Sequence, residues 1–321
     1  MLLKLVPDNT HLHFMKLRIA AFILSAVLIV GSVAALATRG LNLGVDFAGG
    51  TVIETTVPEG VTTQDIRDFV GTLNVADLNV TDAIGTGTNP IQVFVIKFKT
   101  PEDYEESGEE GQSLTDLVRV DLIEQYPGMI IRSSETVGPK VSHELFNAGI
   151  MALAVSLVLM LAYIAFRFQW NFSVGAVAAL AHDVIITMGM FAVTRLEFDL
   201  TTIAALLTII GYSMNDTVVV FDRVREEMRK YKKMPLGEVI DLALNGTLSR
   251  TLLTSGTTLL ALLAIFFLGG PVLRGMSFAL IFGVVIGTYS SIFVASSILM
   301  TIGVAREKRA AEDVPGFQGA P

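Results

Sequence analysis

The stretch LTTIAALLTIIGYSMNDTVVVFDR, residues 200–223, decides the fold of this chain. Its apolar part is about as long as a membrane-spanning helix, which needs roughly 20 residues to cross about 30 Å of hydrocarbon. Asn215 and Asp216 interrupt it. An ionisable side chain at the centre of a bilayer costs about 2.5 to 3.5 kcal/mol on translocon-based scales. The stretch therefore predicts a membrane helix built around a functional carboxylate.

Five further stretches are long and apolar enough to span a membrane, namely residues 19–37, 146–166, 172–194, 251–273 and 275–305. The whole chain of 321 residues is 52% hydrophobic with a mean hydropathy of +0.60, outside the range of soluble proteins. We predict an α-helical polytopic membrane protein with six transmembrane helices: the first at 17–38, and the second to sixth within 145–305. The first is expected to be an uncleaved anchor, because its core exceeds the roughly 7 to 15 apolar residues of a signal peptide.

Lysine and arginine residues mark one side of the predicted membrane domain. They occur before the first span, between the second and third, in a loop predicted at 222–247, and after the sixth. Short loops rich in these residues stay in the cytoplasm. We therefore expect a cytoplasmic N-terminus at 1–16, a cytoplasmic tail at 306–321, and residues 39–144 outside the cytoplasm.

Residues 39–144 have the composition of a folded α+β domain. Alternating or β-branched segments at 51–57, 78–84, 91–99 and 129–137 predict strands, and helical spacing at 62–74 and 113–126 predicts helices. The resulting order β-α-β-β-α-β is the ferredoxin-like pattern. An acidic segment at 101–111 is expected to be a solvated loop.

Several classes of protein are excluded or disfavoured. The chain has no cysteine, which excludes disulfides, cysteine-ligated metals and a thiol nucleophile, and its net charge of −8 gives no sign of nucleic-acid binding. An HExxH motif fails at Asn147, a nucleophile elbow fails at Asn215, and no Walker loop is present. We expect no enzyme activity, no metal and no cofactor.

Asp216 is the leading candidate for chemistry. At 1.5 Å per residue it lies about 9 Å from the expected boundary at Asp222, too deep for its short side chain to reach water. Helical spacing places Thr208, Tyr212 and Asn215 on the same face as Asp216. We expect these residues to form a polar stripe on an otherwise apolar helix.

Arg250 begins the next span at a similar depth. Thr254 and Thr257 follow it at helical spacing, so they predict a second polar stripe on the neighbouring helix. Protonation of Asp216 would break a pair with Arg250 and change the preferred helix packing. A static ion pair that only fixes packing is the alternative.

Two further polar residues, His182 and Asp183, lie near the middle of the third span. A proton-relay role and a structural hydrogen bond to a neighbouring helix both remain open for them. Gly283 and Gly287 form a small-xxx-small pair, which is typical of helix packing.

Four segments resemble the SecF family: GVDFAGGT at 44–51, VGPKVS at 137–142, GYSMNDTVVVFDR at 211–223 and NGTLSRTLLTS at 245–255. The resemblance implies half of a twelve-helix bundle of the resistance-nodulation-division (RND) superfamily, with a periplasmic domain at 39–144. It implies an obligate SecD partner, contacts with the SecYEG channel, YajC, preprotein and lipid, and residence in the bacterial inner membrane. Late, ATP-independent export driven by the proton motive force would be its function. In the family, the positions of Asp216 and Arg250 are implicated in proton conduction.

Two alternatives stay open. The first is a proton-driven RND-type exporter of small hydrophobic molecules, which would need a large apolar pocket among its outer domains. The second is a non-transporting translocon assembly factor, in which Asp216 and Arg250 would form a structural pair.

Overall fold

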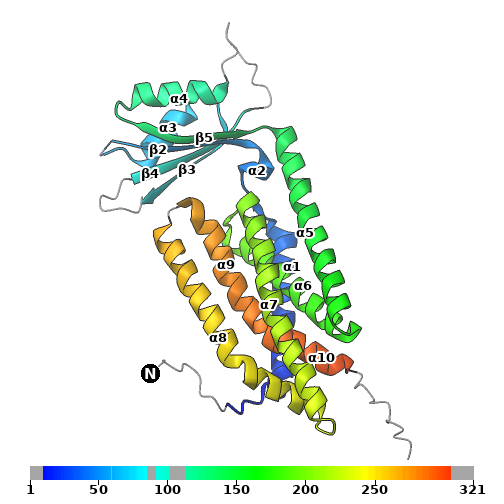
Figure 1. Cartoon of the computed structure of the whole chain (residues 1–321). Coiled ribbons are helices and arrows are strands. Elements are labelled where there is room, and N and C mark those ends of the chain that lie inside the picture. Colours follow the sequence, from blue (N-terminus) through cyan, green and yellow to red (C-terminus); the bar gives the residue numbers. More distant parts are fainter. Residues whose placement is uncertain (1–9, 59, 85–91, 102–112, 270, 305–321) are drawn as a thin grey trace, which may run out of the picture.

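The computed structural model describes residues 10–58, 60–84, 92–101, 113–269 and 271–304. All but the first residue of the expected acidic loop, and the whole C-terminal tail at 306–321, lie outside these ranges. The described chain forms a helix bundle with an α+β domain at one end (Figure 1).

Six helices are long and apolar enough to cross a membrane, which confirms the predicted number within the described residues. The first is α1 (Arg18–Arg39), which follows the short 3₁₀ helix η1 (Phe14–Leu17). The next four are α5 (Pro139–Arg167), α6 (Trp170–Thr194), α7 (Leu200–Lys230) and α8 (Leu236–Leu268). The sixth is α9 (Pro271–Tyr289), which continues through the π-helix η2 (Ser290–Ala295) into α10 (Ser296–Ile302).

Three helix ends, the end of α7 and both ends of α8, differ from the sequence prediction. Most of residues 222–247, expected to be a loop, is helical, because α7 continues to Lys230 and α8 begins at Leu236. Glu226 pairs with Arg223 and Lys230 at helical spacing, which stabilises α7 where its side chains become polar. The fifth helix ends at Leu268 rather than 273, because Pro271 starts a new helix and cannot continue the old one.

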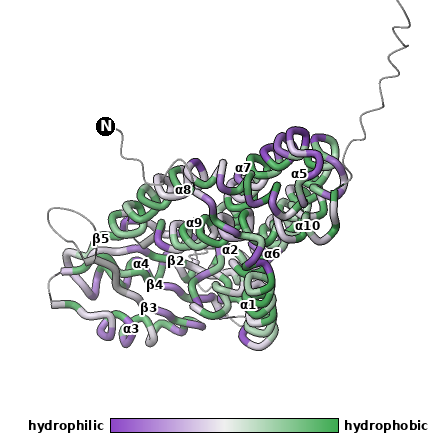
Figure 2. The backbone as a smooth tube through the Cα atoms, turned by 90° about the horizontal axis from the view of Figure 1, so that it is seen from below, coloured by the Kyte–Doolittle hydropathy of each residue, from purple (hydrophilic) through white to green (hydrophobic). Residues whose placement is uncertain are grey.

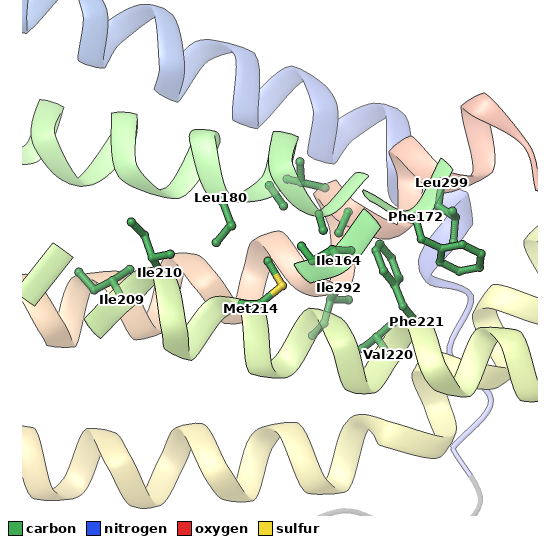
Figure 3. Close-up of a cluster of buried hydrophobic side chains, with 14 of the residues drawn as sticks. Ile164, Phe172, Leu180, Ile209, Ile210, Met214, Val220, Phe221, Ile292 and Leu299 are labelled. Carbon is green, nitrogen blue, oxygen red and sulfur yellow. The ribbon is translucent and has the colours of Figure 1, made fainter. Parts of the chain in front are cut away.

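The centre of the bundle is formed by α6, α7 and the C-terminal part of the sixth span. Phe172 of α6 and Phe221 of α7 meet edge to face with ring centroids 5.2 Å apart. They belong to the same buried cluster as Leu180, Ile210 and Met214, which lie further along the bundle (Figure 3). By contrast, many apolar side chains of α1 and α8 are exposed, as in helices in contact with lipid. Figure 2 shows that both helices consist largely of hydrophobic residues.

The predicted small-xxx-small pair on the sixth span does pack against another helix. A Cβ atom at Gly287 would lie 3.1 Å from the Cβ of Ser213 on α7, and one at Gly283 would overlap Ile209. The two glycines therefore allow α9 to approach α7 closely.

The α+β domain has the ferredoxin-like topology that the sequence predicted. Its elements are β2 (Gly50–Thr56), α3 (Thr63–Gly71), β3 (Ala76–Ile84), β4 (Gln92–Lys99), α4 (Leu114–Gln125) and β5 (Ile130–Val137). The sheet is antiparallel with strand order β3-β4-β2-β5. Thr62 and Ser113 cap the two helices, and Ile53, Ile66, Phe94 and Val118 are fully buried in the core between sheet and helices.

Three short elements join this domain to the bundle, and sequence patterns did not predict them. Strand β1 (Asn42–Leu43) pairs in parallel with β6 (Glu197–Phe198), and the helix α2 (Val45–Ala48) follows β1. The carboxylate of Asp46 accepts a hydrogen bond from the Leu200 N–H (2.9 Å), at the start of α7. Lys97 of the sheet forms an ion pair with Glu197. The α+β domain is thus attached directly to the beginning of the helix that carries Asp216.

Candidate functional site: buried carboxylates in the helix bundle

Asp216 lies on the face of α7 that packs against α8. Its side chain is 9% exposed, and its Oδ1 accepts a hydrogen bond of 2.7 Å from the Thr251 hydroxyl. Its Oδ2 is buried and has no hydrogen-bond partner among the described residues. Buried carboxylate oxygens usually have partners, so this free oxygen marks Asp216 as a place where a proton can bind.

Arg250 does not contact Asp216 directly. It is exposed on α8, and within the described part of the chain no ion pair of 4 Å or less joins the two side chains, although the guanidinium is near enough to interact electrostatically with the carboxylate. Consecutive residues of a helix point about 100° apart, so Thr251 takes the inward position and Arg250 the outward one. The direct pair expected from helix depth is therefore absent here.

The polar stripe predicted on α7 is divided between two faces. The Tyr212 hydroxyl donates to the Ser255 hydroxyl of α8 (3.2 Å), so Tyr212 follows Asp216 toward α8. Asn215 is exposed and lines a groove of about 860 Å³ between α5 and α7. Thr208 is exposed and donates back to the Ala204 carbonyl of its own helix (2.8 Å). Only Tyr212 thus shares the side of α7 on which Asp216 meets α8.

The stripe predicted on α8 points away from α7. Thr254 and Thr257 are exposed, like Arg250, and donate to carbonyls of their own helix. The inward positions belong to Thr251 and to Ser255, which also bonds Thr288 of α9 at 2.8 Å. The spacing Thr251-Ser255 is helical too, and that signal could have identified these two residues.

His182 and Asp183 form a second buried polar cluster, in α6. Their side chains are 2% and 1% exposed, and Nδ1 of His182 lies 2.9 Å from Oδ1 of Asp183. Oδ2 of Asp183 accepts hydrogen bonds from Ser213 of α7 (2.6 Å) and Ser290 of η2 (2.7 Å). The structural hydrogen bonds considered from the sequence therefore exist, and they reach two other helices.

No group of three or more histidine, aspartate or glutamate residues that could hold a metal ion occurs among the residues described. What the site can do chemically follows from its carboxylates. Asp216 has a free buried oxygen near a fixed positive charge, and protonation would neutralise it with little change in shape.

Comparison with family models gives two matches. The C-terminal model of the SecD/SecF protein export membrane proteins matches residues 121–305, and the SecD/SecF GG motif matches residues 34–57. The first match contains all six helices except α1, and the second contains the short elements β1 and α2 that attach the α+β domain.

Curated relatives cover nearly the whole chain. The protein translocase subunit SecF of Rhodobacter capsulatus is 45% identical over 95% of this chain and 93% of its own length. SecF of Haemophilus influenzae is 40% identical over 92% of this chain. The protein translocase subunit SecDF of Brucella abortus is 39% identical, and the match covers 97% of this chain but 40% of the longer protein. These names describe transport rather than catalysis.

Two solved structures are similar. The crystal structure of SecDF from Thermus thermophilus, a translocon-associated membrane protein, matches with a TM-score of 0.78 and 34% identity. The match covers 93% of the present chain and 39% of the SecDF chain. SecDF in the super-membrane-facing form matches with a TM-score of 0.64 and 36% identity. The present chain therefore spans about two fifths of the length of the SecDF structures.

Proposed function

Because the chain belongs to the SecD/SecF family of protein export membrane proteins, we propose that it is the SecF half of a proton-driven export machine. With a SecD partner, it uses the proton motive force to promote late, ATP-independent stages of preprotein export. The observation that carries this proposal is the buried Asp216 carboxylate, with one oxygen bound by Thr251 and the other free.

The proton acts on Asp216. When Asp216 is charged, Thr251 and the field of Arg250 stabilise it; when it is neutral, that electrostatic attraction is lost and the contact between α7 and α8 weakens. One charge moving through the membrane potential gains about 2.3 kcal/mol per 100 mV, so a proton supplies on the order of 3 to 5 kcal/mol under typical gradients. That energy is enough to bias a two-state element strongly.

The α+β domain receives the movement through the start of α7. The contact from Asp46 to Leu200 and the ion pair between Lys97 and Glu197 tie the domain to the helix that carries Asp216. A shift of α7 against α8 would therefore tilt the domain. In the proposed cycle, this tilting helps to hold or pull the preprotein after it leaves the SecYEG channel.

A SecD-like partner would cover the polar face of α8. Arg250, Thr254 and Thr257 point outward there, and an arginine facing lipid is unfavourable. In the SecDF relatives, the region similar to this chain is part of a longer chain, which supports association with SecD. The partner half would bring polar groups against this face and complete the surroundings of Asp216. YajC and membrane lipid are further proposed contacts.

The proposed location is the bacterial inner membrane, with both termini in the cytoplasm and the α+β domain in the periplasm. The end of the bundle far from the α+β domain carries Arg223, Arg225, Arg229 and Lys230, which supports this orientation (Figure 1).

Reconstituted export tests the proton role directly. Inner-membrane vesicles carrying Asp216→Asn should lose the part of reporter export that depends on the proton gradient, while export driven by ATP alone continues. Asp222→Asn, at an exposed position six residues further along α7, serves as the matched control and should behave as wild type. Wild-type stimulation by the gradient in the Asp216→Asn vesicles would refute the proposed mechanism.

Isolation in mild detergent tests the partner. A SecD-like protein should remain bound to the chain. Recovery of a homotrimer without such a partner would contradict the proposal and favour a small-molecule exporter.

A further inference from the structure

The His182–Asp183 cluster lies at the centre of the bundle and plays no part in the cycle proposed above. Asp183 is 13 residues from the start of α6 and 11 from its end, so water at either end is about 17 to 20 Å away along the helix. The cluster connects four segments. Besides Ser213 and Ser290, it includes Ser25 of α1, whose hydroxyl lies 3.1 Å from Nε2 of His182.

The hydrogen bonds determine how many protons the cluster holds. Tyr289 donates its hydroxyl hydrogen to the Ala21 carbonyl (2.8 Å), because a carbonyl can only accept. The contact of 3.1 Å between Tyr289 and Ser25 must then use the hydrogen of Ser25. Ser25 has no second hydrogen to give, so Nε2 of His182 carries a hydrogen and donates it to Ser25.

One more proton is needed on the other side of the imidazole ring. Ser213 and Ser290 donate to Oδ2 of Asp183, which leaves the contact of 2.9 Å between Nδ1 of His182 and Oδ1 of Asp183. Two lone pairs would repel each other at this distance, so a hydrogen lies between them. The pair is imidazolium with carboxylate, or imidazole with carboxylic acid, and its net charge is zero in both forms.

A net charge of zero suits this depth. Loss of the shared proton would leave a net negative charge on the buried pair, with Oδ1 of the carboxylate facing an imidazole lone pair. Other titratable or charged groups are few around the pair. Tyr289 is in contact with it, and the titratable groups Asp216 and Tyr212 of α7 are directed toward α8 instead. The charged residues of α1, α5 and α9 lie toward the ends of those helices.

The π-helix η2 begins at the serine that contacts this pair. Its first residue, Ser290, is bound to Asp183, and its second, Ser291, lies 2.9 Å from the hydroxyl of Thr217, the neighbour of Asp216. Single-turn π-helices are rare and occur frequently at functional sites. This segment therefore contacts both the proton-holding pair and the turn of α7 that carries Asp216.

We propose that His182 and Asp183 form a second protonation site, which holds one shared proton, and that η2 couples it to the turn carrying Asp216. The shared proton follows from the contacts of the pair alone. The coupling rests on the function proposed above, because it assigns a changing charge to Asp216.

Nitrogen NMR of the full chain in lipid nanodiscs tests the shared proton. The chain has four histidines, and His11, His13 and His143 are exposed, so selective ¹⁵N-histidine labelling with a His182→Gln variant identifies the signal. At neutral pH, His182 should show a proton attached to Nε2 and a hydrogen-bonded Nδ1. A His182 signal without a proton on Nε2, or with an Nδ1 that takes part in no hydrogen bond, would overturn the proposal; the His182→Gln variant serves only to assign the signal.

The same signal tests the coupling. Asp216→Asn should shift the His182 nitrogen resonances, and Ser291→Ala should remove that shift. Ser297→Ala is the matched control, because this serine is equally buried in the same span and its hydroxyl has no partner among the described residues. Unchanged His182 resonances in Asp216→Asn would overturn the coupling. Failure of the proposed function would be seen in a different measurement, the export assay, in which the Asp216→Asn variant would keep its full gradient-driven export.

Discussion

Thr251 of α8 donates a hydrogen bond to Asp216 of α7, with 2.7 Å between Oγ1 and Oδ1. Both residues lie inside the bundle, and the other carboxylate oxygen has no partner within the described structure. One hydroxyl thus fixes the orientation of the carboxylate and leaves one oxygen available for a proton. The arrangement explains why this polar pair can be kept between two apolar helices.

Replacing Thr251 tests this relationship. Thr251→Val keeps the shape but leaves a buried acceptor unsatisfied, at a cost of about 1 to 3 kcal/mol. We expect gradient-dependent export to fall roughly tenfold, in line with that energy. Thr251→Ser keeps the hydroxyl and should retain most of the activity. Equal loss in both variants would show that packing, rather than the hydrogen bond, is what matters.

The ion pair between Lys97 and Glu197 should transmit movement to the α+β domain. Both groups are partly exposed, so each single charge removal should cost no more than about 1 kcal/mol of stability. Lys97→Glu alone should reduce gradient-dependent export, because it places two negative charges together. Adding Glu197→Lys should restore export, and failure of the double variant to do so would speak against this contact as the link.

Close packing of α7 and α9 should limit substitutions at Gly287. A leucine there would press on Ser213, and overpacking of this kind typically costs about 1 to 3 kcal/mol. We expect Gly287→Leu to lower the midpoint of thermal unfolding in detergent. Gly256→Ala is the control, since its added Cβ meets no other atom within 4 Å and should leave the midpoint unchanged or higher.

Acid should weaken the start of α3. The hydroxyl of Thr62, then its backbone N–H, donate to Asp65 and hold the pKa of that carboxyl below its ordinary value. Because the pKa of Asp65 is lower in the folded than in the unfolded domain, the charged carboxylate stabilises the folded domain at pH values above the unfolded pKa. This contribution is lost as the pH falls through the folded pKa. Hydrogen exchange in α3 should therefore be slower in wild type than in Asp65→Asn above about pH 5, and the difference should shrink below about pH 4.

The orientation can be tested without background labelling, because the chain has no cysteine. Glu124→Cys in the α+β domain and Lys233→Cys after α7 both place a thiol at an exposed position. In intact spheroplasts, a membrane-impermeant maleimide should label the first and not the second. Inverted vesicles should give the opposite result, and labelling of both from one side would contradict the proposed topology.

Much of the fold was predictable, because its signals are local. A helix needs about 20 consecutive apolar residues to cross a bilayer, so each of the six spans could be identified from its own sequence, without knowledge of the neighbouring helices. The strands and helices of the α+β domain follow from periodicity within short segments, and their order was enough to predict the ferredoxin-like topology. Thr62 and Ser113 cap their helices where the spacing indicates.

The site was only partly predictable. The position of Asp216 within an apolar stretch predicted a buried carboxylate. The same reasoning, however, predicted a pair between Asp216 and Arg250 and placed Asn215 on the same face as Asp216. The structure instead turns Thr251 toward Asp216 and leaves Arg250 and Asn215 exposed. Helical spacing tells which residues of one helix share a face, but it does not tell how that helix is rotated toward its neighbours.

What the sequence determined by itself was the membrane class, the number of spans, the domain between the first two, and the presence of a carboxylate within the fourth. Only the tertiary structure decided which groups meet: Thr251 with Asp216, Lys97 with Glu197, and Ser25, Ser213 and Ser290 with the His182–Asp183 pair. The physical reason is that these contacts join segments far apart in the chain. Side-chain packing across the whole bundle sets the rotation of each helix, and no single segment encodes it.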